Sequence, residues 1–208
     1  MSAPESIVIV VDDDPSVCRS TVRLIQSAGY KVKAFTSGHE FLKQPPPKEP
    51  ACLVLDLRMP GLSGIDVQRG LIESEIRIPI IFITAHGDIP TTVHAMKAGA
   101  VEFLTKPFRS RDLLDAVHSA IDRDRSARAK RSEIDDLRLR YEQLTPRERE
   151  VMSLITAGLL NKQAADKIAT TERTIKFHRT HIMRKMKAES LAGPVRMAEK
   201  LGTLSQHK

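Results

Sequence analysis

The chain has 208 residues, a length typical of one or two domains. Hydrophobic residues make up 41% and charged residues 28%, which argues against wholesale disorder. No apolar run approaches the ~18–20 residues of a membrane span, and the first residues lack the basic region of a secretory signal. We therefore expect no membrane partner. The two cysteines, Cys18 and Cys52, could form at most one bridge and lack metal-ligand spacing, so we expect a reduced, cytoplasmic protein.

The formal net charge of +7 is concentrated in the last third of the chain. Residues 1–120 hold 13 basic and 14 acidic side chains, and residues 121–144 hold 7 and 6. Residues 145–208 hold 13 basic and only 6 acidic side chains. A near-neutral region followed by a small basic one predicts a control domain joined to a domain that binds a polyanion.

The first 120 or so residues alternate short apolar runs with amphipathic stretches. Asp14 followed by Pro15 is typical of a helix N-terminus. The predicted strands cover residues 7–11, 31–35, 51–55, 80–83 and 101–104. The predicted helices cover about residues 15–29, 39–43, 65–72, 90–98 and a segment that starts near residue 110. This alternation predicts a doubly wound α/β domain, with a parallel sheet covered by helices on both faces.

Polar side chains follow four of the predicted strands. Asp12 and Asp13 follow the first strand, Asp56 the third, Thr84 the fourth and Lys106 the fifth. In such sheets ligands bind at the carboxyl ends of the strands, so we expect these side chains to share one edge. Three carboxylates would repel one another without a cation between them, and small divalent ions prefer carboxylate oxygens. A carboxylate, a metal and a lysine can together accept a phosphoryl group.

Four motifs at this edge resemble those of the receiver domain of two-component response regulators. They are Val11-Asp12-Asp13-Asp14, Asp56-Leu57-Arg58-Met59-Pro60-Gly61, Thr84-Ala85-His86-Gly87-Asp88 and Lys106-Pro107-Phe108. The resemblance covers about residues 5–125. It implies a flavodoxin-like receiver domain over residues 5–124, with five parallel strands in the order 2-1-3-4-5.

The resemblance also implies a metal site and a phosphoryl acceptor. Asp56 resembles the aspartate that accepts the phosphoryl group. Asp13 and Asp56 resemble the carboxylate ligands of Mg²⁺ (or Mn²⁺), and the backbone carbonyl of Arg58 resembles a third ligand. Asp12 is expected to act on the metal chiefly through water.

The remaining receiver positions imply a switch. Lys106 resembles the lysine that pairs with the phosphate, with a cis bond to Pro107. Thr84 resembles the switch hydroxyl and Phe103 the switch aromatic, although by sequence alone Phe103 would be ordinary core. The implied partner is a cognate sensor histidine kinase, whose phosphohistidine donates the phosphoryl group to Asp56. Thr84 then moves towards it, Phe103 fills the vacated space, and the face of the fourth helix and fifth strand is reshaped.

Residues 125–143 have alternating charges and few core residues, which predicts a solvated helical linker. Ile134, Leu137, Tyr141 and Leu144 form an apolar stripe two turns long. A stripe this short does not establish a coiled coil. We favour a linker, with a dimerisation zipper as the alternative.

Residues 144–204 have helical periodicity throughout. Thr145-Pro146-Arg147-Glu148 is a capping box with proline at the first helical position. The predicted helices cover about residues 146–157, 161–168 and 171–186, with a fourth after Ser190. Two short helices and a turn before a basic helix are the outline of a helix-turn-helix.

Three motifs in this region resemble the LuxR-type helix-turn-helix domain. They are Leu144-Thr145-Pro146-Arg147-Glu148-Arg149-Glu150-Val151, Gly158-Leu159-Leu160-Asn161-Lys162 and Thr174-Ile175-Lys176-Phe177-His178. With the receiver, they make the whole chain resemble the FixJ-like branch of the NarL/FixJ family. This implies a transcription regulator that binds double-stranded promoter DNA when phosphorylated, with RNA polymerase as a candidate partner.

A helix over residues 171–186 has two distinct faces. The core stripe consists of Ile175, His178, Ile182 and Met186. The basic face consists of Arg173, Lys176, Phe177, Thr180 and Arg184. By resemblance, Lys176, Phe177 and Thr180 face the bases, where lysine can reach guanine and an apolar group can touch a thymine methyl. The expected phosphate contacts are Asn161, Lys162, Thr171, Thr174, Arg179 and Lys185.

The chain departs from the family pattern at three places. Thr170 replaces an aliphatic residue and His181 replaces an asparagine. Gly193 and Pro194 interrupt the last predicted helix, through which the DNA-binding domains of the family dimerise. We therefore expect the phosphorylated protein to form a homodimer through the receiver face.

Two other functions compete with this interpretation. A phosphohydrolase with an aspartyl nucleophile commonly has a second acid two residues later, where this chain has Arg58. We therefore expect no enzyme activity beyond the chain's own phosphorylation and dephosphorylation. An adaptor whose basic end binds a protein is the other alternative, and steep salt dependence of DNA binding would distinguish the two.

Overall fold

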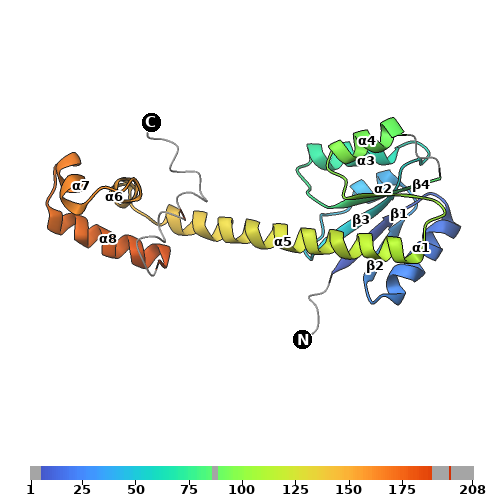
Figure 1. Ribbon diagram of the computed structural model, residues 1–208, viewed down its shortest axis with the longest axis horizontal. Coiled ribbons are helices and arrows are strands. Elements are labelled where there is room, and N and C mark those ends of the chain that lie inside the picture. Colours follow the sequence, from blue (N-terminus) through green and yellow to red (C-terminus); the bar gives the residue numbers. More distant parts are fainter. Residues whose placement is uncertain (1–5, 86–88, 189–196, 198–208) are drawn as a thin grey trace. The chain divides into compact units, whose positions relative to one another are not determined.

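The computed structural model describes residues 6–85, 89–188 and 197. Contacts divide the chain into two compact units, residues 1–128 and 129–208 (Figure 1). The division falls inside the segment 125–143 that the sequence marks as a linker. Within the described residues, no helix is both long enough and apolar enough to cross a bilayer.

The first unit contains one parallel sheet of five strands in the order β2-β1-β3-β4-β5, which confirms the predicted fold. The strands are β1 (Ile7–Val11), β2 (Lys31–Phe35), β3 (Ala51–Asp56), β4 (Ile80–Thr84) and β5 (Glu102–Thr105). The central strands β1, β3 and β4 are buried along their whole length, whereas β2 at the edge is mostly exposed. Burial on both faces explains why the central strands are continuous apolar runs.

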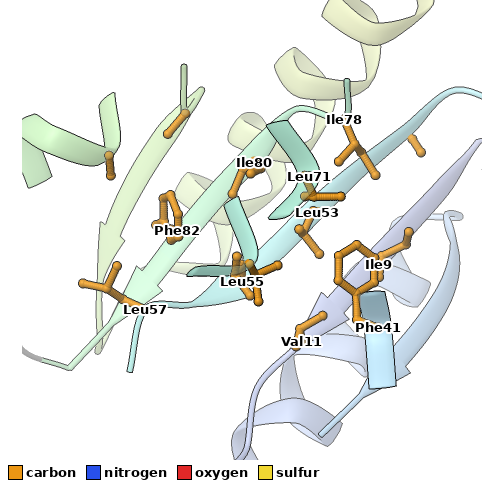
Figure 2. Close-up of a cluster of buried hydrophobic side chains, with 14 of the residues drawn as sticks. Ile9, Val11, Phe41, Leu53, Leu55, Leu57, Leu71, Ile78, Ile80 and Phe82 are labelled. Atoms are coloured by element: carbon orange, nitrogen blue, oxygen red, sulfur yellow. The ribbon is translucent and has the colours of Figure 1, made fainter. Parts of the chain in front are cut away.

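Helices cover both faces of this sheet. They are α1 (Pro15–Ser27), α2 (Gly38–Leu42), α3 (Gly64–Glu73), α4 (Ile89–Lys97) and α5 (Ser110–Glu142). Phe41 of α2, Leu71 of α3 and Ala95 of α4 pack on one face, part of which is drawn in Figure 2. Ile25 of α1 and Leu113 of α5 pack on the other. Successive strand residues alternate between these two apolar layers.

The caps that the sequence predicts in this unit are present. The side chain of Asp14 accepts hydrogen bonds from the backbone N–H groups of Ser16 (2.7 Å) and Val17 (3.3 Å). Pro15 occupies the first turn of α1, as expected. At the far end of α1, Gly29 has φ = +88°, a left-handed conformation that favours glycine.

Helix α5 continues without a break through the predicted helical linker to Glu142. The segment contains no glycine or proline that would end it. Asp124, which is almost fully buried, anchors the helix by accepting a hydrogen bond from the N–H of Ala51 (2.9 Å). Arg128 pairs with Asp124 (2.6 Å) and donates to the carbonyls of Pro47 and Lys48 (both 3.0 Å).

The second unit contains α6 (Pro146–Thr156), α7 (Asn161–Lys167) and α8 (Glu172–Met186), in addition to the end of α5. The capping box is formed: Thr145 Oγ1 accepts from Glu148 N (3.2 Å), and Glu148 Oε2 accepts from Thr145 N (2.8 Å). Tyr141 and Leu144 from the apolar stripe pack in the core of this unit. The expected fourth helix after Ser190, with Gly193 and Pro194, lies outside the described residues.

Candidate functional sites

Sheet topology gathers the predicted receiver residues at the carboxyl edge of the strands. Asp12 directly follows β1, Asp56 ends β3, Thr84 ends β4 and Lys106 directly follows β5. The parallel register places Asp56 beside Ile83 and pairs Thr84 with Thr105. These four side chains therefore come from four different strands to one site.

Lys106 bridges two of the carboxylates. Its Nζ atom lies 2.7 Å from Asp12 Oδ2 and 2.6 Å from Asp56 Oδ2. The other oxygens also have partners, since Asp12 Oδ1 accepts from Asp14 N and Asp56 Oδ1 accepts from Arg58 N, both at 3.0 Å. The peptide bond from Lys106 to Pro107 is cis. The arrangement fixes both carboxylates and places an ammonium group beside the Asp56 oxygen.

Burial and charge act against each other in this pocket. Removal from solvent raises the pKa of the Asp12 carboxyl despite its hydrogen bond from Lys106, because Asp12 has no exposed surface. Burial also opposes the charge on Lys106, but hydrogen bonds to Asp12 and Asp56 outweigh it and raise the pKa of the ammonium. The lysine therefore stays charged between the two acids.

Asp12, Asp13 and Asp56 can approach a single cation together. One carboxylate oxygen from each lies within 4.8 Å of the others. Asp13 is partly exposed, so the cluster is open to solvent on one side. Three oxygen donors at this spacing suit a hard divalent cation. The Arg58 carbonyl remains a predicted ligand.

The two predicted switch residues differ in their surroundings. Thr84 is fully buried, and its carbonyl accepts a hydrogen bond from Lys106 N (2.7 Å). Phe103 is half-buried, with its ring centroid 6.4 Å from that of Phe82. Phe103 thus packs at the margin of the core on β5, beside the strand that ends at Thr84.

Helix α8 separates an apolar face from a basic one, as the periodicity predicts. Ile175, Ile182 and Met186 are fully buried in the core, and His178 is half-buried. The exposed side chains on the opposite face are Arg173, Lys176, Phe177, Thr180 and Arg184. Thr171 caps the helix through a hydrogen bond from Thr174 N (3.1 Å).

The side chains expected to contact phosphate fall into two groups. Lys162 and Thr171 are exposed, and Asn161 and Thr174 are half-exposed. Arg179 donates to Asn161 Oδ1, which ties α7 to α8. Asn161, Lys176, Arg179, Thr180 and Met183 line an open hollow of about 450 Å³ between these helices.

Lys185, a predicted phosphate contact, has protein partners for its ammonium. Its Nζ atom lies 2.6 Å from Glu148 Oε2 and 3.2 Å from the carbonyl oxygen of Gln143. Burial opposes the charge on Glu148, but the hydrogen bonds from Lys185 and from the Thr145 backbone lower the pKa of its carboxyl. Lys185 thus ties α8 to α6 through Glu148, and its contact with phosphate stays a prediction.

Two further residues of the second unit have side-chain contacts that the sequence did not predict. Arg149 donates to the carbonyl of Glu142 (2.9 Å), and its guanidinium lies 5.4 Å from the Tyr141 ring centroid. His181 contacts the Phe177 ring, with 4.3 Å between ring centroids. The only sequence signal for His181 was that it replaces the asparagine common at this position.

Comparisons with known proteins match both halves of the chain. Residues 8–118 match the family described as response regulator receiver domain, and residues 142–198 match bacterial regulatory proteins, luxR family. Nodulation protein W of Bradyrhizobium diazoefficiens is 50% identical over 206 residues, which cover 99% of this chain and 91% of that protein. Response regulator protein TodT of Pseudomonas putida is 44% identical over 201 residues, 97% of this chain and 88% of that protein.

Solved structures agree with these relatives. The structure of response regulator StyR is similar with a TM-score of 0.86 and 46% identity, covering 94% of this chain and 99% of that one. Full-length FixJ from B. japonicum is similar with a TM-score of 0.59 and 38% identity, and the match covers 98% of this chain and 100% of that one.

The fold and the two sites define a protein with a receiver for a kinase signal and a helix-turn-helix for DNA. The chain belongs to the response regulator family, in its FixJ-like group with a luxR-type DNA-binding domain. Its function is therefore phosphorylation-dependent regulation of transcription.

Proposed function

We propose that Asp56 is the phospho-acceptor through which this regulator controls its binding to promoter DNA. The observation that carries the proposal is the contact of Lys106 with both Asp56 and Asp12. An ammonium group fixed 2.6 Å from the acceptor carboxylate is placed to neutralise an incoming phosphoryl group. A cognate sensor histidine kinase is the proposed donor.

In the transfer, a carboxylate oxygen of Asp56 forms the new bond to phosphorus, and the bond from phosphorus to the kinase histidine breaks. Asp12, Asp13 and Asp56, with the Arg58 carbonyl, would hold Mg²⁺ or Mn²⁺, which supplies further neutralisation of phosphoryl charge when bound. Lys106 pairs with the phosphoryl oxygens. No external substrate is involved, so the chemistry is confined to phosphorylation and dephosphorylation of the chain itself.

We propose that Thr84 and Phe103, on the neighbouring strands β4 and β5, form the switch that responds to phosphorylation. Thr84 is buried at the end of β4, and its hydroxyl is proposed to turn towards the phosphoryl group. Phe103 on the neighbouring strand then occupies the space that Thr84 leaves. The face of α4 and β5 changes shape, and the phosphorylated chains pair there as a homodimer.

DNA readout is proposed to lie on the exposed face of α8. Lys176, Phe177 and Thr180 face the bases, with Arg173 and Arg184 beside them. Lys176 has an exposed ion pair with Glu172 (3.3 Å), which is weak enough to give way to DNA. The proposed phosphate contacts are Asn161, Lys162, Thr171, Thr174 and Arg179. RNA polymerase is the proposed partner at the promoter, and the cytoplasm is the compartment that this function implies.

Removal of the acceptor carboxylate tests the proposal. Asp56→Asn should abolish incorporation of phosphate from acetyl phosphate or a histidine kinase, measured with radiolabelled donor. Asp115→Asn is the matched control, because Asp115 is an exposed carboxylate on α5 with 73% of its side chain accessible. A labile phosphoryl label that persists on the Asp56 variant would contradict the assignment.

Coupling to DNA is tested separately by footprinting. Beryllofluoride mimics the acyl phosphate, and it should increase the affinity of the wild-type chain for paired half-sites. The Asp56 variant should show no increase. Equal affinities of the wild-type chain with and without beryllofluoride would contradict coupling between the two domains.

A further inference from the structure

Three side chains spaced by four and three residues form a column along the exposed face of α8. The rings of Phe177 and His181 are tilted by 37°, with their centroids 4.3 Å apart. Arg184 Nη2 lies 3.3 Å from His181 Nδ1 on the following turn. His181 therefore contacts Phe177 through its ring and Arg184 through a ring nitrogen.

The contact with Arg184 holds one edge of the imidazole. A guanidinium has only hydrogen-bond donors, so His181 Nδ1 is on the accepting side of this contact. The imidazole ring thus lies between the Arg184 guanidinium and the apolar ring of Phe177.

The surroundings of His181 distinguish it from a core histidine. Its neighbours Phe177 and Arg184 are both exposed, and 58% of the Phe177 surface is accessible. The residues of α8 that fill the core are Ile175, Ile182 and Met186. The edge of the half-buried His178 ring also approaches Phe177, but at a longer centroid distance of 5.8 Å. His181 is thus the closer of the two rings that restrain Phe177.

A restrained ring is useful at a DNA interface. Side chains that are ordered before binding lose less conformational entropy on association. Phe177 is the one apolar member of the proposed base-facing set, and the apolar feature of the major groove is the 5-methyl group of thymine.

We propose that His181 is a positioning residue for DNA readout, which holds the Phe177 ring against a thymine methyl group in the major groove. The inference rests on the proposed base-facing position of Phe177. His181 itself need not touch a base. Its effect is on the choice of sequence rather than on attraction to the phosphate backbone.

Replacement of thymine by deoxyuridine measures this effect, because it removes only the methyl group. The full-length chain, activated with beryllofluoride, is used first to select its preferred site from random duplexes. Each thymine of that site is then replaced in turn. We expect one thymine in each half-site at which deoxyuridine weakens wild-type binding by roughly three- to fivefold, the effect of burying one methyl group.

Variants at the two positions assign the effect. Phe177→Ala should abolish the difference between thymine and deoxyuridine, and His181→Ala should reduce it to below about twofold. His181→Ala should cause no further loss in the Phe177→Ala background. His181→Phe retains a ring beside Phe177 and should restore the difference. His118→Ala, on α5 in the first unit, is the control for removal of a histidine outside the DNA-binding unit.

The readout separates this inference from the function on which it rests. Affinity for random duplex DNA should be the same for the wild-type chain and the His181 variants, which excludes general loss of folding. A wild-type thymine preference that His181→Ala leaves unchanged would overturn the positioning role alone. A wild-type chain that selects no sequence at all would overturn both the proposed readout face and this inference.

Discussion

The receiver pocket and the face of α8 use charge in opposite ways. In the pocket, Asp12 is fully buried and Lys106 is already paired with two carboxylates. On α8, Arg173 and Lys176 are exposed, and the ammonium of Lys176 forms a weak, exposed ion pair with Glu172 of the same helix. A site for covalent chemistry needs fixed groups in a medium of low polarity, whereas a surface for a polyanion needs cations that remain available.

This contrast predicts that changes in the pocket have larger effects than single changes on the surface. Lys106→Met should slow phosphorylation by acetyl phosphate about 100-fold, because it removes the cation beside the acceptor. The initial rate of label incorporation measures the effect. Lys43→Met, at the exposed end of α2, is the control and should be neutral. A Lys106 variant with the wild-type rate would show that the preformed contact is unimportant for transfer.

Lys185 sharpens the comparison. It lies in the basic domain, but like Lys106 of the receiver pocket it is paired with a buried carboxylate. Lys185→Met leaves the buried Glu148 carboxylate without its cation and should destabilise the second unit by about 1.5–3 kcal/mol. Urea denaturation measures the change. Lys187→Met is the control, because Lys187 is an exposed lysine two residues after Lys185. If Lys185→Met instead weakens DNA binding with unchanged stability, the phosphate contact predicted from the sequence is correct.

The same ion pair has a pH dependence of known sign. The pKa of Glu148 is lowered in the folded chain, so its contribution to stability is present above the ordinary value of 4.5 and is lost as pH falls through the lower folded value. Glu148→Gln should therefore flatten the loss of stability below about pH 4.5. Denaturation midpoints of wild type and variant across this range measure it, and parallel curves would contradict it.

Gly64 connects the packing of α3 to the phospho-acceptor. A Cβ atom there would lie 2.5 Å from the carbonyl oxygen of Asp56 and 3.0 Å from Phe82, so the helix or the strand end must move. Gly64→Ala should destabilise the receiver by about 1–3 kcal/mol and slow phosphorylation of Asp56. Gly70→Ala in the same helix is the matched control, because its Cβ meets only the flexible end of Leu42 at 3.3 Å. Equal stability of the two variants would contradict the close approach.

The smallest effect is expected for a single exposed cation on α7. Lys162→Ala should weaken binding to all DNA sequences alike and reduce the slope of affinity against salt concentration by about 0.9, the value for one phosphate contact. Fluorescence anisotropy over a range of salt concentrations measures both. A change confined to one base pair would show that Lys162 reads sequence.

Helices and strands that begin or end at signals local in the sequence were predictable. Asp14 and Pro15 begin α1, Thr145 and Glu148 cap α6, and the apolar runs form the central strands. The gathering of Asp56 with Lys106 was also predictable, because parallel topology brings the ends of β3 and β5 to one edge.

Contacts between residues distant in sequence were not predictable in this way. The partner of Lys185 is Glu148, on a different helix, and Asp124 pairs with the backbone of Ala51. Nothing in the local pattern around Lys185 or Asp124 distinguishes them from the solvated charges nearby. The helical character of residues 125–143 was predicted from their composition, whereas their union with the helix that starts at Ser110 into one element is visible only in the structure.

The hydrogen bond from Ala51 to Asp124 determines where the receiver can be separated from the rest of the chain. The family match ends at residue 118, before Asp124 and Arg128. A fragment cut there loses the acceptor for the first N–H of β3 and the donor to Pro47 and Lys48. The strand that carries Asp56 at its far end would then fray from its start. An isolated receiver fit for phosphorylation assays must therefore extend at least to Arg128.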